Sequence, residues 1–210
     1  MGPADHHIHE GQATIATVKA RKGDRVVVQE KLDGSCCAVA RTAEGDLVAL
    51  GRAGYLAATS PFEQHHLFAR WVDDNAARFD WLPAGDRLVG EWLAQAHGTR
   101  YDLPHEPFVI FDWMTGPERA THFQTSVAAI ECALPTPHLI SDGDAFSVDD
   151  ALAAIATSHH GAVDPVEGAV WRVEHKGRVD FLVKYVRPDK VDGCYLPEIS
   201  GGDPVWNWQP

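Results

Sequence analysis

The chain has 210 residues, 45% of them apolar and 23% charged, which are values of a globular protein with its own core and not of a disordered chain. Its 30 acidic residues outnumber 18 Lys and Arg, and the net charge of −12 argues against a general nucleic-acid coat protein while leaving room for a small basic cleft. There is no apolar run of ~18 residues, no signal-peptide pattern and no disulfide framework, so we expect a reduced, cytoplasmic protein without a membrane partner.

The predicted elements begin at residue 25, after a polar and weakly patterned lead segment, residues 1–24. Residues 26–28 and 36–41 are β-rich and flank Asp33-Gly34, which predicts two strands joined by a hairpin turn. Residues 47–50 form a third predicted strand. Apolar residues recur at helical spacing over residues 61–79, which predicts a helix there.

The second half of the chain continues this mixture. Residues 88–93 and 108–113 are predicted strands, and residues 121–132 a short helix. Ser147 and Asp150 resemble a capping box and predict a helix that Gly161 ends. Residues 166–173 and 179–186 flank Lys176-Gly177 and predict a β-hairpin. The pattern is therefore α+β and not a βαβ series, with residues 188–210 as a tail that wraps the domain.

One stretch is chemically suggestive: Glu30-Lys31-Leu32-Asp33-Gly34, at the end of an apolar strand. A lysine is a nucleophile only when it is deprotonated, which requires desolvation or nearby cations. Gly34 would let the backbone approach a phosphate closely. Taken alone, the same residues are explained as well by a surface turn with a solvated lysine.

Further stretches follow in order along the chain: Gly51-Arg52, Gly90-Glu91-Trp92-Leu93, Phe108-Val109-Ile110-Phe111-Asp112, Glu167-Gly168-Ala169-Val170 and Leu182-Val183-Lys184-Tyr185-Val186-Arg187. Together with residues 30–34 they resemble the ordered motifs of the covalent nucleotidyltransferases, and most closely those of ATP-dependent RNA ligases. The resemblance implies a single nucleotidyltransferase (ATP-grasp-like) adenylylation domain of antiparallel sheets flanked by helices over residues 25–187, with no OB-fold domain after it.

The resemblance also implies roles for single residues. Lys31 would attack the α-phosphate of ATP to form lysyl-AMP, and Lys184 would contact that phosphate and help to depress the pKa of Lys31. Phe111 would stack on the adenine, and Glu91 would accept hydrogen bonds from the ribose hydroxyls. The remaining implied contacts are to adenine or nucleotide for Glu30, Asp33, Gly34, Arg52 and Arg187, and to Mg²⁺ or Mn²⁺ for Glu167 and Asp112.

Each role has a structural alternative. Phe111 could belong to the core, Glu91 and Glu167 could be solvated, and Arg52 could be an ordinary hairpin cation. A structural hydrogen bond would explain Asp112 equally well. The closing strand carries Lys184 where many relatives have two lysines, and Arg187, three residues on, faces the opposite side unless the strand ends or bulges at Pro188.

Two polar segments stay open between a functional and a structural explanation. The loop His97-Gly98-Thr99-Arg100-Tyr101 could grip RNA or a 5′-phosphate, or could be tied down by its own hydrogen bonds. The N-terminal histidines, His6, His7 and His9, could bind metal or belong to a flexible terminus.

The function implied by the resemblance is RNA repair: an ATP-dependent RNA ligase that transfers AMP to an RNA 5′-phosphate and seals this end to a 3′-OH. Its partners would be RNA ends with a 5′-phosphate and a 3′-OH, which a nicked duplex could present, and a helper protein for substrate binding. The alternatives are a small DNA nick ligase, a capping-type guanylyltransferase and an inactive nucleotide-binding module.

Overall fold

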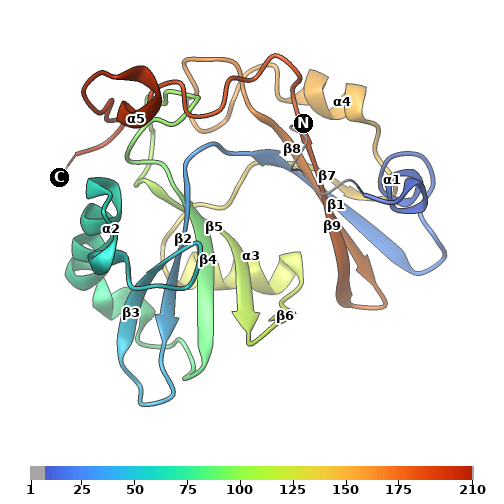
Figure 1. Cartoon of the computed structure of the whole chain (residues 1–210). Helices are drawn as coiled ribbons and strands as arrows, with labels where there is room; N and C mark the ends of the chain where they lie inside the picture. Colours follow the sequence, from blue (N-terminus) through green and yellow to red (C-terminus); the bar gives the residue numbers. More distant parts are fainter. Residues whose placement is uncertain (1–7, 210) are drawn as a thin grey trace.

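The computed structural model describes residues 8–209; residues 1–7, with His6 and His7 of the N-terminal tract, and residue 210 lie outside that range. The described chain forms two antiparallel sheets that splay apart (Figure 1). Sheet A has the order β7 (Leu139–Gly143), β1 (Asp24–Lys31), β8 (Gly168–His175), β9 (Arg178–Val186). Sheet B has the order β3 (Leu47–Gly51), β2 (Ser35–Arg41), β4 (Asp86–Trp92), β5 (Phe108–Thr115), β6 (Glu118–Arg119). The expected α+β class with antiparallel sheets and flanking helices is confirmed.

Sheet B packs one face against α2 (Glu63–Asp74), the 3-10 helix η2 (Ala76–Phe79) and α3 (His122–Glu131). Alternation along β4 explains why only one face of the sheet is packed, because its residues are buried and half-buried in turn. Leu88 and Trp92 enter the core, while Arg87 and Glu91 face the other side. Trp92 lies there against Phe68 of α2. The opposite face of sheet B is thereby left for polar chemistry.

Sheet A packs against α1 (Glu10–Thr17) and α4 (Val148–Ala154), which cover the face that carries Val28 and Trp171. A smaller cluster joins the two sheets and contains Leu32, Leu93 and Tyr101. The remaining short helices are η1 (Ala57–Thr59) and α5 (Pro197–Ser200). None of the helices within residues 8–209 is long and apolar enough to cross a membrane.

The predicted hairpin around Asp33-Gly34 is wrong. Strand β1 ends at Lys31 in sheet A, and β2 starts at Ser35 in sheet B, so the connection crosses from one sheet to the other. β1 has no free edge for β2, because it already pairs with β7 and β8. The crossing depends on Gly34, since a Cβ there would lie 2.5 Å from the carbonyl oxygen of Trp92.

The other strands and helices expected from the sequence are present, with two changes in helix length. The hairpin of β8 and β9 turns at Lys176-Gly177, both with positive φ, as a two-residue hairpin loop requires. The helix expected over residues 61–79 breaks at Asn75 into α2 and η2. The helix that Ser147 caps ends at Ala154, well before Gly161, and the chain turns to place residues 158–160 beside β1.

Candidate active site

Lys31 lies where the chain leaves sheet A for sheet B, with its side chain 20% exposed. Its ammonium donates to Oε2 of Glu167 at 2.5 Å. The register of the sheet brings the two together, because Lys31 pairs with Gly168, the residue after Glu167. The lysine and the glutamate expected to bind metal therefore form one ion pair at the junction of the sheets.

Electrostatics in this junction favour a charged lysine. Burial lowers the pKa of Lys31, but the nearby carboxylates of Glu167 and Glu91 outweigh it, so the pKa ends above its ordinary value. Burial also raises the pKa of Glu91, to about 7, against the opposing effect of Lys31. Without nucleotide, Lys31 is thus held as an ammonium and not as the free amine that a nucleophile needs.

Glu91 comes from β4, the central strand of sheet B, on the face away from the core. Its Oε1 accepts the backbone N–H of Gly34 at 3.0 Å. The opposite residue on β2 is Cys36, whose thiol pKa burial raises to about 11. Cys36 is therefore a neutral packing neighbour of Glu91.

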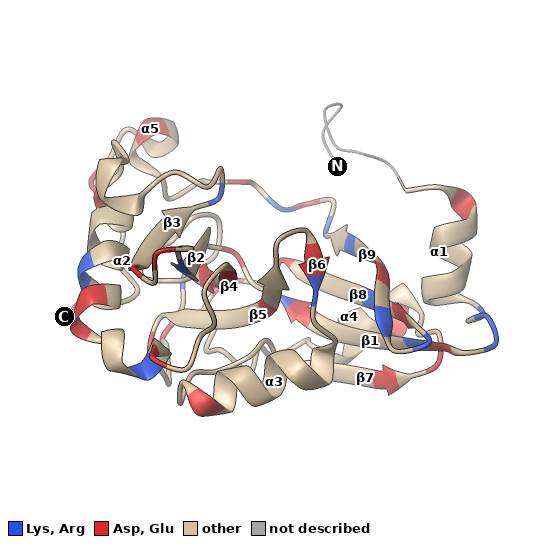
Figure 2. Cartoon of the chain, turned by 90° about the horizontal axis from the view of Figure 1, so that it is seen from below, with Lys and Arg blue, Asp and Glu red and all other residues tan. Residues whose placement is uncertain are grey.

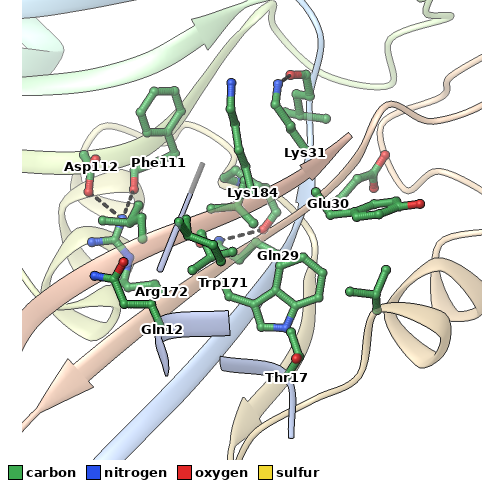
Figure 3. A pocket seen from close by; sticks show the side chains of 18 of the residues that line it. Gln12, Thr17, Gln29, Glu30, Lys31, Phe111, Asp112, Trp171, Arg172 and Lys184 are labelled. Atoms are coloured by element: carbon green, nitrogen blue, oxygen red, sulfur yellow. Dashed lines mark hydrogen bonds and ion pairs between the residues drawn. The ribbon is translucent and has the colours of Figure 1, made fainter. Parts of the chain in front are cut away.

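A cavity of about 980 Å³ opens beside Lys31 (Figure 3). Lys184 and Phe111 line it from β9 and β5, and Figure 3 shows both side chains on the same side of sheet A as Lys31. The register agrees, because Lys184 pairs with Val170, and Val170 pairs with Gln29 on the face of β1 that Lys31 shares. Lys184 is exposed and has no ion-pair partner among residues 8–209. An anion entering the cavity would meet it directly.

Two predicted nucleotide-binding residues are bound to protein atoms, although one of them, Glu30, also lines the cavity. Glu30 is 2% exposed, and its carboxylate accepts Ser158 Oγ–H at 2.5 Å and His159 N–H at 3.2 Å. Asp33 accepts Gly98 N–H at 2.8 Å and also binds the ammonium of Lys190. These contacts hold the backbone on both sides of Lys31.

Asp112 is fully buried and lies between two guanidinium groups. Arg172 binds its Oδ1 at 2.5 Å, and Arg119 binds its other oxygen. Arg172 also donates to the carbonyl of Phe111 at 2.8 Å, so the trio fixes the strand that carries the aromatic ring. This geometry favours the structural alternative for Asp112 and gives its predicted metal role no support.

Arg52 and Arg187 lie outside the cavity lining. Arg52 is exposed after β3, close enough for its charge to act on the Cys36 thiol. Arg187 donates to the carbonyl of Val166 at 2.5 Å and pairs with Asp189, so it braces the segment before Glu167. This placement agrees with the expectation that Arg187, three residues after Lys184 in a strand, faces the opposite side.

The loop of residues 97–101 is tied down by hydrogen bonds, which is the structural alternative given above. Arg100 forms a two-pronged pair with Asp164 at 2.9 and 3.0 Å. Tyr101 is 5% exposed, and its hydroxyl accepts the N–H of Asp33 at 3.0 Å. Through Tyr101, the loop therefore holds the connection from β1 to β2 that follows Lys31.

Three functional candidates escaped the sequence reasoning: Arg119 and Arg172, which line the cavity, and Lys190 of the tail. A basic residue inside the apolar strand of residues 166–173 was a usable signal for Arg172. Figure 2 shows basic residues on β6, β8 and β9, where acidic residues also occur, and acidic residues on α1, α3 and α5. The net charge of −12 thus coexists with basic groups in the cavity.

Comparisons with known proteins agree with this architecture. A family model described as RNA ligase matches residues 24–186. An archaeal ATP-dependent RNA ligase superposes with a TM-score of 0.58 and 21% identity, over 84% of this chain and 45% of that one. A Naegleria gruberi RNA ligase with PPi gives 0.60 and 17%, over 91% and 55%, and a lysine variant of it with ATP and Mn gives 0.59 and 16%, over 84% and 52%.

The chain spans about half the length of these structures, and at such identities the likeness concerns the fold. No curated protein sequence matches the chain.

Proposed function

The chain belongs to the RNA ligase family, and from this premise we propose that it is an ATP-dependent RNA ligase that works through a lysyl-AMP intermediate at Lys31. The observation that carries the proposal is the junction of the two sheets. There Lys31, paired with Glu167, borders a cavity that Phe111 and Lys184 line from other strands. This set suits a purine nucleoside triphosphate: the lysine would face the α-phosphate, the aromatic ring the base, and the free cation the phosphates.

In the first step, Nζ of Lys31 would attack the α-phosphorus of ATP. The ammonium would first lose one proton to solvent to give the free amine. The N–P bond then forms as the bond from the α-phosphorus to the oxygen that bridges it to the β-phosphate breaks, pyrophosphate leaves, and the nitrogen releases a second proton to solvent. Lys184 would stabilise the charge that develops on the α-phosphate, a role supported by its exposure to the cavity on the same face of sheet A. Phe111 would stack on the adenine, and the Glu91 carboxylate would accept hydrogen bonds from the ribose hydroxyls.

The remaining predicted contacts divide into two groups. Glu30, Asp33 and Gly34 would act by positioning the backbone around Lys31, since their polar groups are bound to protein atoms. Arg52 would meet phosphate or ribose at the rim, and Arg187 would hold the strand that carries Glu167.

A divalent cation fits this site only together with the nucleotide. Residues 8–209 contain no group of three or more acidic, His or Cys side chains that could hold a metal by themselves. Mg²⁺ commonly binds through one or two carboxylates plus substrate phosphates, and Glu167 offers one such carboxylate beside Lys31. Bound there, Mg²⁺ or Mn²⁺ would offset the charge of Glu167 and of the phosphates.

Transfer of AMP to an RNA 5′-phosphate and attack by a 3′-OH would follow at the same cavity. Lys184 is the exposed cation there and would neutralise an RNA phosphate, whereas Arg119 and Arg172, which also line the cavity, are paired with Asp112. Because the chain as a whole is acidic, we propose that RNA binding by this chain alone is weak and salt-sensitive, and that a helper protein strengthens it.

The first test is labelling of the protein with α-labelled ATP and Mg²⁺. A covalent label that is acid-labile and alkali-stable is expected for wild type and for the exposed control Lys22→Ala, and none for Lys31→Ala. Labelling that survives in Lys31→Ala would overturn the assignment of the nucleophile. Parallel reactions with GTP, and sealing of nicked RNA against nicked DNA, separate an RNA ligase from a guanylyltransferase and a DNA ligase.

A further inference from the structure

The segment after β9 runs back across the loops that surround Lys31, and the family model ends before it, at residue 186. Tyr195 N–H donates to the carbonyl of His97 at 2.8 Å, and Asn207 donates to that of Leu93 at 2.8 Å. Arg187 holds the carbonyl of Val166. The tail residues that make these contacts lie outside the residues that the family model matches.

Lys190 makes the deepest of these contacts. Its side chain is 3% exposed, and its ammonium donates to Oδ2 of Asp33 and to Oγ1 of Thr99, the latter at 2.8 Å. The same oxygen of Asp33 accepts Gly98 N–H at 2.8 Å. Packing around the ammonium is tight, because a Cβ on Gly98 would lie 2.8 Å from Nζ of Lys190.

Asp33 belongs to the short connection that follows Lys31, and both its N–H and its Oδ2 are engaged. Its N–H donates to Tyr101 Oη at 3.0 Å, and the next N–H, of Gly34, donates to Glu91 at 3.0 Å. The Lys190 contact is thus a further fixed point on the same connection. Without it, the Asp33 carboxylate would be left nearly buried and without its counter-charge, which favours movement of the loop toward water.

We propose that Lys190 is a positioning residue for Lys31: by binding Asp33, it holds the connection from β1 to β2 in the shape that aims the Lys31 side chain. This rests on the proposed adenylylation at Lys31. Lys190 does not line the cavity, so it acts through Asp33 and not on the nucleotide. A misplacement of ~1 Å can cost about 10²-fold in rate, which is the scale of effect expected from a loosened loop.

The test compares single-turnover adenylylation of wild type, Lys190→Met and the control Lys22→Met, which removes one exposed lysine and so the same net charge. Lys190→Met is expected to lower the rate at saturating ATP by roughly 10- to 100-fold, while the ATP concentration for half-maximal rate changes less than about 3-fold. The control should match wild type in both. A purely structural weakening would instead lower the amount of active protein or change both parameters.

A double-mutant cycle with Asp33→Asn tests the route. If Lys190 acts through Asp33, the double variant should adenylylate at saturating ATP less than about 3-fold more slowly than Asp33→Asn alone. Rate losses that multiply would overturn the proposal, as would a wild-type rate in Lys190→Met.

If Lys190→Met does not fold, Thr99→Val removes one hydrogen-bond partner of Lys190 with little change in shape. It is expected to lower the saturated rate about 3-fold, as loss of one net hydrogen bond would, and an unchanged rate overturns the proposal. Failure of the proposed function is seen separately, because wild type would then carry no label at all.

Discussion

Glu91 of sheet B accepts the backbone N–H of Gly34 at 3.0 Å, just beyond the proposed nucleophile of sheet A. This bond joins the sheets where the chain crosses between them. Burial raises the pKa of the same carboxylate to about 7, so Glu91 changes its charge near neutral pH while it supports the Lys31 connection. The stability of the junction therefore depends on pH.

Glu91→Gln should remove part of this pH dependence. The folded pKa of Glu91, about 7, lies above the 4.5 of an ordinary glutamate, so the folded state binds the extra proton. The stability that this proton contributes is present below pH 4.5 and is lost as pH rises through 7, by roughly 3 kcal/mol in all. Urea unfolding at pH 5 and pH 8 should show a larger loss for wild type than for Glu91→Gln. Equal losses would contradict the assigned titration.

Glu167→Gln should lower the pKa of Lys31. Burial depresses this pKa, and the carboxylate of Glu167 is the largest opposing influence, so its removal lets burial dominate. Labelling of Lys31 by an amine-reactive reagent, followed by mass spectrometry without ATP, should begin at a lower pH in the variant. Adenylylation should nevertheless fall by about 10²-fold or more, because the proposed metal ligand is lost.

The exposed Glu118→Gln is the control for that experiment and should behave as wild type in both assays. Lys31 labelling with the same pH onset in Glu167→Gln would show that the 2.5 Å pair does not set the charge of the lysine.

The sequence predicts the fold best where local pattern and long-range pairing agree. Strand β4 alternates strictly, and the Lys176-Gly177 turn is correct for a hairpin, so both elements were found. At Asp33-Gly34 the local signal pointed to a hairpin, but the chain changes sheet there. Strand β7 was missed because Leu139–Gly143 carries few apolar residues and forms an edge of the sheet.

For the candidate site, too, local sequence patterns predict some residues but not the long-range contacts that hold them. The ordered motifs pointed to Lys31, Phe111 and Lys184, which the fold brings around one cavity. The partners that hold a residue in place lie far away in the sequence: Arg172 for Asp112 and Lys190 for Asp33. Such pairings depend on strand register and on the path of the tail, which no local pattern contains.

Phe111→Ala should weaken ATP binding without abolishing it. Stacking on a base contributes about 1–3 kcal/mol, so the Kd for ATP should rise by roughly 5- to 150-fold, and Phe111→Tyr should restore most of the affinity. Equilibrium binding to Lys31→Ala protein, which cannot be adenylylated, measures this directly. The control is Phe123→Ala on α3, a side chain that is 67% exposed, and it should leave the Kd unchanged. An unaltered Kd in Phe111→Ala would instead make the ring a packing residue.

Asp112→Leu should destabilise the protein by about 3–5 kcal/mol, because it leaves Arg172 buried without its partner. The double variant Asp112→Leu/Arg172→Met should recover most of that loss, since it replaces the pair with apolar groups. Urea unfolding measures both. In the folded double variant, the Mg²⁺ concentration for half-maximal adenylylation should equal that of wild type. A rise of about 10-fold or more, comparable to the loss of a metal ligand, would return Asp112 to the metal site.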